Sequence, residues 1–149
     1  MDELLRALSR VVLVDRTLDD VLAEITTIAK LGIPGAEAVS ITLVRNDKAF
    51  TAAYDGEMSL AADELQYERG YGPCMDAGRG GVVLRVDDMQ TEERWPDYVA
   101  RVRAETPVRS SLSVPLPYQG TMIGALNVYS GERAAFASPE SLRAGLDAA

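Results

Sequence analysis

The chain has 149 residues, of which 47% are apolar and 26% are charged, a composition typical of one soluble globular domain. Its 15 basic and 23 acidic residues give a net charge of −8, and with no run of Lys or Arg this argues against direct binding of nucleic acid or of an anionic membrane. Histidine is absent, which removes histidine-ligated haem, the usual catalytic triads and most zinc sites.

Cysteine usage and the N-terminus bear on the cellular compartment. Cys74 is the single cysteine, so no disulfide can form within the chain and a reducing compartment is compatible. The N-terminus is acidic and lacks the apolar core of a signal peptide. No apolar run approaches the roughly 20 residues of a membrane span. We therefore expect a cytoplasmic domain without a membrane partner.

The first third of the chain predicts two helices and a β-hairpin. Apolar residues recur at helical spacing over residues 2–14 and again over residues 18–31. Residues 38–44 and 49–54 alternate in polarity as strands do, and Asn46-Asp47 between them is a strong hairpin-turn signal.

The middle of the chain is less regular. Residues 58–64 show only weak patterning, which predicts a loop with at most a short edge strand. Residues 65–81 are glycine-rich and loop-like, with one turn of helix beginning at Pro73. Residues 82–86 predict a strand, and residues 97–104 a short helix.

A long hairpin dominates the last third. Residues 109–130 read as two strands joined at Gln119-Gly120, the second of them apolar on both faces except at Asn127 and therefore central in a sheet. A final helix is expected over residues 138–149. The fold class that results is α+β. A central antiparallel sheet of five to six strands should carry the terminal helices on one face, and loops plus short helices on the other.

Three segments carry a family resemblance: GYGPCMDAGRGG (70–81), VDDMQTEERWPDY (86–98) and RSSLSVPLPYQGTMIGALNVYS (109–130). The chain resembles the GAF domain family over nearly its whole length. It is most similar to actinobacterial GAF domains of the kind that often precede an ANTAR RNA-binding domain. The resemblance leaves two alternatives open: a stand-alone domain over residues 1–149, or a segment truncated within residues 138–149 before an output domain.

The resemblance implies a regulatory domain that holds a small molecule or a reactive group between the sheet and a lid. It also implies a homodimer packed through the terminal helices, with residues 1–15 at the interface. Several family chemistries are disfavoured, because cyclic-nucleotide-binding members carry an Asn-Lys-Phe-Asp-Glu signature, haem- and bilin-binding members use histidine, and members that reduce free methionine sulfoxide use several cysteines. Met75, not histidine, follows Cys74. The cofactor is therefore unassigned, with neither histidine-ligated haem nor bilin expected.

Cys74 is the candidate for redox chemistry. In the first turn of a helix that begins at Pro73, the free N–H groups and the helix dipole would lower the pKa of its thiol, whereas nearby Asp76 would raise it. An exposed thiol of lowered pKa could be oxidised or could bind an electrophile. The alternative is a small hydrophobe buried under the lid, which is the usual fate of a lone cysteine.

Aromatic and polar side chains on otherwise apolar segments are the candidates for ligand contacts, since pockets are mostly apolar with a few placed polar groups. The simpler alternative for the aromatic ones is core packing. The predicted ligand-binding residues are Tyr54, Tyr71, Cys74, Met75, Trp95, Ser111, Ser113, Asn127 and Tyr129.

Three further motifs have a chemical and a structural interpretation. The glycines of residues 70–81 could cradle a phosphate, but they lack a P-loop pattern, so a lid with tight turns is favoured. Asp87-Asp88 could hold a cation, but an aspartate turn is the simpler interpretation and no metal site is expected. The arginines around the second lid helix could bind an anion or could form surface salt bridges; they are Arg94, Arg101, Arg103 and Arg109.

These observations predict a sensory domain without catalysis of its own, in signal transduction or transcription regulation. The alternative is a dimerisation module whose pocket has collapsed and whose helices Leu4–Val12 and Pro139–Leu146 carry the function. A second alternative is a single-cysteine redox sensor. A polar cavity above about 300 Å³ would favour the sensor. A pocket filled by Met75, Met122 and aromatic residues would favour the module.

Overall fold

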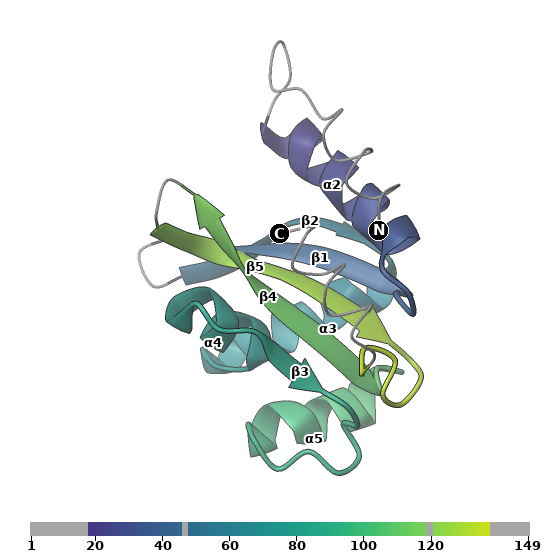
Figure 1. Ribbon diagram of the computed structural model, residues 1–149. Coiled ribbons are helices and arrows are strands. Elements are labelled where there is room, and N and C mark those ends of the chain that lie inside the picture. The colour runs from purple at the N-terminus through teal and green to yellow at the C-terminus, as the bar shows by residue number, and fades with distance from the viewer. Residues whose placement is uncertain (1–17, 46–47, 119–120, 138–149) are drawn as a thin grey trace.

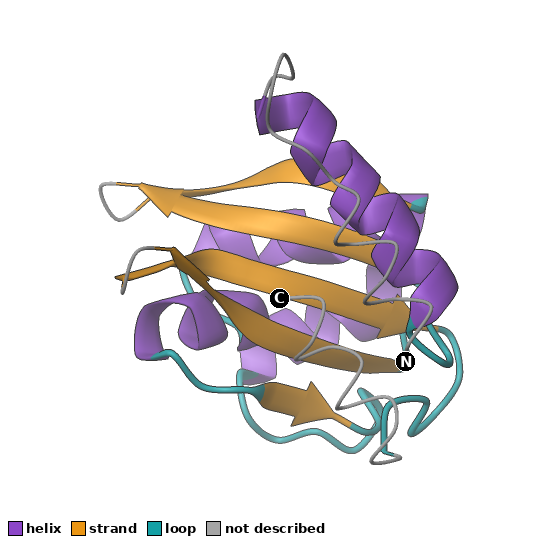
Figure 2. Cartoon of the chain, turned by 45° about the horizontal axis from the view of Figure 1, so that its top comes forward, coloured by secondary structure: helices purple, strands orange, loops and turns teal. Residues whose placement is uncertain are grey.

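A computed structural model describes residues 18–45, 48–118 and 121–137, and its centre is an antiparallel sheet (Figure 1). Five strands in the described residues follow the order β2-β1-β5-β4-β3. Helix α2 crosses one face of this sheet, and α3, α4 and α5 form a layer on the other side (Figure 2). The predicted α+β class is therefore confirmed.

The face under α2 holds a largely apolar core. Helix α2 spans Leu18–Gly32, as its apolar periodicity predicts, and packs on β1 (Ala38–Arg45) and β2 (Lys48–Asp55). Alternate residues of the strands point toward it, as a period of two requires. The buried members of this core are Ala29, Ile33, Val39, Ile41, Leu43, Leu112, Val114, Leu126, Val128 and Phe136.

The long hairpin forms β4 (Ser110–Tyr118) and β5 (Thr121–Ser130), and β5 lies between β1 and β4 as predicted. Both predicted turns, at residues 46–47 and 119–120, lie outside the described residues.

The prediction of a loop over residues 58–64 is wrong, and so is that of a loop-like segment over residues 65–69. They belong to helix α3, which spans Glu57–Arg69 between Gly56 (φ 105°) and Gly70 (φ 75°). The reason is physical: α3 turns Ser59, Asp63 and Gln66 toward the sheet, so its buried side is largely polar and shows no apolar periodicity.

The remaining elements differ from prediction mainly in their bounds. Helix α4 spans Pro73–Gly80, longer than the single turn expected, and β3 covers only Leu84–Val86. Helix α5 spans Pro96–Glu105 and packs beside α3.

The helices expected at residues 1–15 and 138–149 lie outside the described residues. Among the helices that are described, none is long and apolar enough to cross a membrane.

Candidate functional site

The face of the sheet opposite α2 carries an unusual number of buried polar side chains. Residues of β1, β5 and β4 that alternate with the apolar core point toward α3 and α4, and cross-strand pairing places Ser40 and Ser113 on either side of Asn127. Each of them is at most 1% exposed: Ser40, Thr42, Ser111, Ser113, Asn127 and Tyr129.

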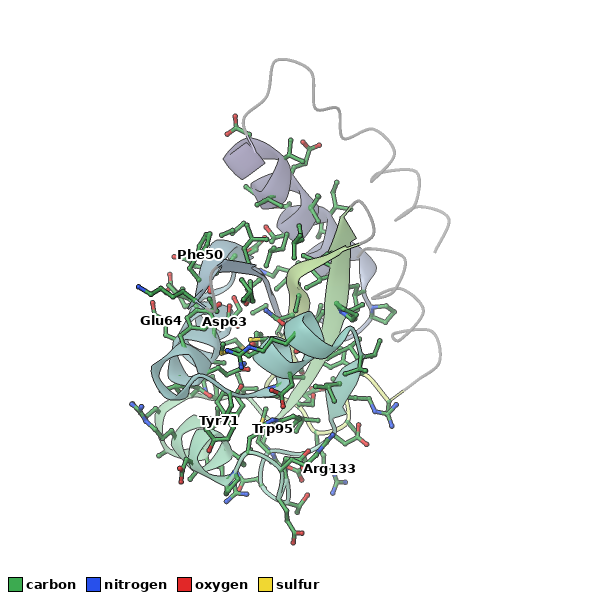
Figure 3. The ribbon with its side chains drawn as sticks, turned by 90° about the vertical axis from the view of Figure 1, so that its left-hand side faces the viewer. Phe50, Asp63, Glu64, Tyr71, Trp95 and Arg133 are labelled. Atoms are coloured by element: carbon green, nitrogen blue, oxygen red, sulfur yellow. The ribbon has the colours of Figure 1, made fainter. Side chains whose placement is uncertain are left out.

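Asp63 of α3 is the charged group of this layer. It is fully buried on the sheet side of the helix, whereas the neighbouring Glu64 is exposed on the outer side (Figure 3). Its carboxylate accepts hydrogen bonds from the hydroxyls of Tyr129, Thr51 (2.8 Å) and Ser40. Burial disfavours the charged form more than these bonds favour it, so the pKa of Asp63 is raised to about 6.

A chain of hydrogen bonds runs from Asp63 back to β5, and its direction can be worked out. Thr51 gives its only hydroxyl proton to Asp63, so Tyr67, 2.7 Å away, must donate to Thr51. The phenol has then used its proton, so Thr42 donates to Tyr67 at 2.7 Å in preference to the sulfur of Cys74 at 3.8 Å. Thr42 in turn accepts a 2.9 Å hydrogen bond from the amide nitrogen of Asn127.

The second N–H of the Asn127 amide donates to Ser40 Oγ at 3.1 Å, which closes a ring of hydrogen bonds through Asp63. Asn127 Oδ1 is left without a partner, and so is Ser111 Oγ on the neighbouring strand. Buried polar atoms are normally paired, because an unpaired one costs about 1–3 kcal/mol. We refer to the following residues as the polar cluster: Ser40, Thr42, Thr51, Asp63, Tyr67, Ser111, Asn127 and Tyr129.

Cys74 lies at the edge of the polar cluster, in the first turn of α4. Its Sγ is 3.8 Å from Thr42 Oγ1, and its backbone N–H donates to Gln66 Oε1 at 2.9 Å. The thiol is fully buried, and burial, with a smaller contribution from the charge of Asp63, raises its pKa well above the ordinary value. The start of the helix therefore does not produce the lowered pKa that redox sensing would need.

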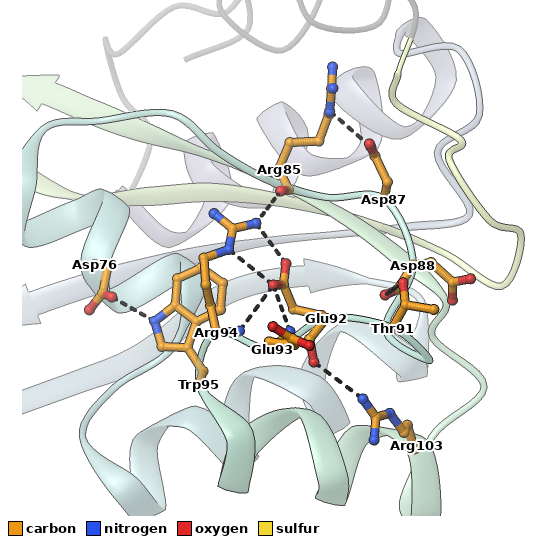
Figure 4. A network of polar contacts seen from close by, with 10 residues as sticks. All are labelled: Asp76, Arg85, Asp87, Asp88, Thr91, Glu92, Glu93, Arg94, Trp95 and Arg103. Atoms are coloured by element: carbon orange, nitrogen blue, oxygen red, sulfur yellow. Dashed lines mark hydrogen bonds and ion pairs between the residues drawn. The ribbon is translucent and has the colours of Figure 1, made fainter.

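Trp95 joins the two short helices of the lid (Figure 4). Its indole N–H donates to Asp76 of α4 at 2.7 Å, and the Arg94 guanidinium lies 4.8 Å from the ring centroid. Arg94 also pairs with Glu92 at 2.6 Å, and this bond lowers the pKa of the carboxyl group of Glu92. Trp95 thus fixes α4 against the start of α5.

The other predicted ligand-binding residues are spread over the lid. Met75 is buried in a small apolar cluster with Ala125, and Tyr71 is half-buried against an apolar cluster that includes Tyr98 and Val99 of α5. Neither residue joins the hydrogen bonds of the polar cluster. Tyr54, in contrast, is 43% exposed on the edge strand β2. Tyr54 is the cross-strand partner of Ser40, so it lies beside the polar cluster without joining its hydrogen bonds.

The aspartates and most of the arginines form ion pairs, whereas Arg103 donates to the backbone carbonyl of Met89 at 2.6 Å. Asp88 pairs with Arg109 at 3.1 Å, and this contact lowers the pKa of the aspartate. Asp87 pairs with Arg85, and Arg101 with Glu105. Within the described residues, no group of three or more potential ligands could hold a metal ion.

An open cavity of about 410 Å³ lies away from the polar cluster, between the start of β1, the first turns of α3 and the end of α5. Glu37, Glu57 and Glu105 are among its lining residues, and none of the predicted ligand-binding residues is. The space between sheet and lid is instead filled by buried side chains, Cys74, Met75 and Gln66 among them. The site as described is closed.

Sequence reasoning missed Asp63 and Gln66 on the α3 side of the site, together with Thr42 and Thr51 on the hairpin. A signal was available in the sequence: Asp63 lies four residues after Ser59 and three before Gln66, which places these polar residues on one face of a helix.

In the described residues, a five-stranded antiparallel sheet carries one helix on one face and a helical lid over a polar layer on the other, an architecture that defines a class of small α+β domains. The sequence model of the GAF domain family matches residues 15–146, and the chain belongs to this family. No curated protein matches the sequence significantly.

Solved structures share the fold. The chain is 25% identical to a free methionine-R-sulfoxide reductase from Neisseria meningitidis in complex with its substrate, with a TM-score of 0.73 over 99% of this chain and 83% of that one. It is 18% identical to the GAF domain of a phosphoenolpyruvate-protein phosphotransferase from Acinetobacter (TM-score 0.68; 95% and 83% covered). It is 14% identical to a domain of a protein from Sinorhizobium meliloti 1021 described as a two-component sensor histidine kinase (TM-score 0.70; 91% and 88% covered).

Proposed function

We propose that the chain is a sensory domain that binds a small molecule at the polar cluster, between the sheet and α4. The observation that carries this proposal is the pair of unpartnered buried atoms, Asn127 Oδ1 and Ser111 Oγ. A core that served packing alone would gain stability by replacing them with apolar groups. A ligand that supplies their missing partners gives these residues a function.

Access requires movement of the lid, and α4 is built to allow it. Glycines in the left-handed region flank the helix at Gly70 (φ 75°) and Gly81 (φ 66°), where the backbone changes direction. A ligand that favours one position of α4 can pass a signal to the terminal helices, because it shifts the balance between two arrangements. We propose a homodimer through those helices, and transcription regulation as in the ANTAR-associated members that the sequence resembles.

The filled lid supports a second candidate, a dimerisation module. In this candidate the polar cluster only specifies packing, and residues 1–15 with residues 138–149 hold two copies together. Analytical ultracentrifugation of a protein without bound ligand, and of a Leu5→Asp variant, tests the dimer separately from ligand binding.

The similarity to the Neisseria meningitidis reductase supports an enzyme candidate. Cys74 would take the sulfoxide oxygen to become a sulfenic acid, and two equivalents of an external thiol would return it to the thiol with release of water and a disulfide. The raised pKa of the buried thiol opposes this step. Incubation with free methionine-R-sulfoxide and dithiothreitol, with Cys74→Ser as control, should give no thiol-dependent turnover.

The main test is native mass spectrometry of protein purified from cells of its own source. We expect a stoichiometric added mass that denaturation removes and that is lost in Asn127→Leu. Arg133→Ala, at an exposed position outside the site, should retain it. Bare protein under these conditions would overturn the sensory proposal, and a bare dimer would support the module.

A further inference from the structure

Resting on the sensory function proposed above, we infer that the polar cluster recognises a small molecule through a protonated amine. The ammonium group would donate to Asn127 Oδ1 and Ser111 Oγ, beside the carboxylate of Asp63. The inference joins two observations: a buried carboxylate paired only with neutral groups, and an unpaired acceptor whose identity the hydrogen-bond chain fixes.

The first observation is an uncompensated charge. In the described part of the chain, the groups that hydrogen-bond to Asp63 are the hydroxyls of Ser40, Thr51 and Tyr129, and none of the recorded ion pairs involves it. A carboxylate buried among neutral groups is costly unless an opposite charge lies nearby. A cation would supply that charge, whereas a phosphate or carboxylate ligand would add repulsion in a site of low dielectric constant.

The second observation is the direction of the hydrogen-bond chain. Because Thr51 donates to the carboxylate, each hydroxyl along the chain donates toward Asp63, and Thr42 can only accept from Asn127. The amide nitrogen of Asn127 therefore faces Thr42, and the carbonyl oxygen is the atom left unpaired. That atom accepts only, so the ligand must donate.

Ser111 Oγ is the second unpaired atom and lies close to the charge; its hydroxyl can accept a hydrogen bond from the ligand as well as donate one. It is the cross-strand partner of Tyr129, and Asn127 lies two residues before Tyr129 on β5, so Ser111 and Asn127 are diagonal neighbours on one face. Tyr129 in turn donates to Asp63. A donor group held between Ser111 and Asn127 is thus separated from the carboxylate by one side chain.

The lid limits the size of the ligand. At Gly78 of α4 an added Cβ would lie 3.1 Å from the backbone of Gly124 on β5, so the helix rests directly on the sheet. A small aliphatic amine with a free ammonium is the class that combines donors, positive charge and limited bulk.

The test uses three probes of nearly equal shape: isobutylamine, isobutanol and isobutyrate. Binding is followed by ligand-observed NMR and by the side-chain amide signal of Asn127, which reports the site itself. We expect isobutylamine to shift that signal and to bind about tenfold more tightly than isobutanol, as for a hydrogen bond assisted by charge. Isobutyrate should not bind.

Two variants test the role of Asp63. Asp63→Asn should weaken the binding of isobutylamine about tenfold and leave the binding of isobutanol unchanged. Asp87→Asn, which removes an exposed acid, should change the binding of neither probe. Should Asp63→Asn fail to fold, the wild type gives the same information, because isobutylamine should bind more weakly as the pH falls from 7.5 to 5. The other titratable groups whose charges act on Asp63, or on which its charge acts, are Glu64, Tyr67, Cys74, Tyr98 and Tyr129.

The outcomes separate the two proposals. Equal or tighter binding of isobutanol or isobutyrate at the Asn127 signal would overturn the amine inference and leave the sensory function standing. A native ligand without a basic nitrogen would do the same. Absence of binding by every probe, together with bare native protein, would overturn both.

Discussion

The indole N–H of Trp95 donates a 2.7 Å hydrogen bond to the carboxylate of Asp76, and this bond ties α4 to the start of α5. Trp95 itself holds a left-handed backbone conformation (φ 51°, ψ 58°), which is unusual for a bulky residue and persists only where the surroundings fix it. The bond therefore acts as a latch on the lid.

Trp95→Phe tests this latch. The variant keeps an aromatic ring but cannot donate, so the lid should open more readily at a cost of about 1 kcal/mol. Hydrogen exchange at the amides of α4 should become about fivefold faster, while the amides of β5 stay protected. Arg94→Ala, which leaves the indole bond intact, should change α4 much less. Equal exchange in all three proteins would contradict the role of the bond.

Asp63 should make stability depend on pH in an unusual direction. Its pKa is raised from 3.8 in the unfolded chain to about 6 in the fold, so between these values the folded protein holds a proton that the unfolded chain has released. The stabilisation from this group is therefore fully present only below pH 3.8 and is lost as the pH rises through 6. Between pH 4 and pH 7.5, the free energy of unfolding of Asp63→Asn should rise by about 2 kcal/mol relative to that of the wild type, as measured by denaturation at both pH values.

Asp88 should make stability depend on pH in the opposite direction. Its pKa is lowered, mainly by the hydrogen bond from Arg109, so its contribution is present above the ordinary pKa and is lost as the pH falls. The free energy of unfolding of the wild type should therefore increase relative to that of Asp88→Asn as the pH rises. The same direction in both variants would contradict the assignment of Asp63.

The apolar side of this fold was predictable from the sequence, and the polar side only in part. Alternation in β4, the apolar run of β5 and the helical period of α2 all report burial, so these three elements were expected. Asn127 stood out because it is polar within an apolar strand. Asp63 did not, because α3 buries polar groups and therefore lacks the periodicity by which helices are recognised.

The hydrogen-bond ring could not be predicted for a different reason. Its members come from β1, β2, α3 and β5, and only the order β2-β1-β5 with α3 laid across it brings them together. Cys74 lies in the first turn of a helix, but burial raises the pKa of its thiol by more than the start of the helix lowers it. Local sequence shows where a group lies along an element; it does not show how much water the rest of the fold removes.

Gly124 should be intolerant of any side chain. A Cβ there would lie 1.8 Å from the carbonyl oxygen of Thr42 on the neighbouring strand, and backbone cannot move aside cheaply. Gly124→Ala should therefore lower the free energy of unfolding by about 1–3 kcal/mol or more, as overpacking of a core does. Gly80→Ala in α4, where the nearest atom would be 3.7 Å away, should be neutral or stabilising by up to about 1 kcal/mol. Thermal denaturation of both variants checks the contrast.

Ser111 and Ser110 are adjacent, but their substitutions should have opposite effects on stability. Ser111 Oγ is buried without a partner, so Ser111→Ala should stabilise the ligand-free protein by about 1 kcal/mol. Ser110 Oγ donates to Glu132 O at 2.6 Å and accepts from the N–H of Ala135, so Ser110→Ala should destabilise it by about 1 kcal/mol. Urea denaturation measures both. A destabilised Ser111→Ala would mean that the hydroxyl has a partner in solution, which would weaken the case for a ligand there.

Cys74 should react slowly in the native protein and should report the opening of the lid. The thiol is fully buried and its pKa is raised, so its thiolate can attack a disulfide reagent such as DTNB only when α4 lifts away from the sheet. At pH 7.5 we expect labelling about 100-fold slower than in urea-unfolded protein. Because the Trp95 latch controls the same opening, Trp95→Phe should speed labelling by the factor seen in hydrogen exchange. Fast, stoichiometric labelling of the wild type would instead indicate an exposed thiolate and would support the redox sensor over the ligand sensor.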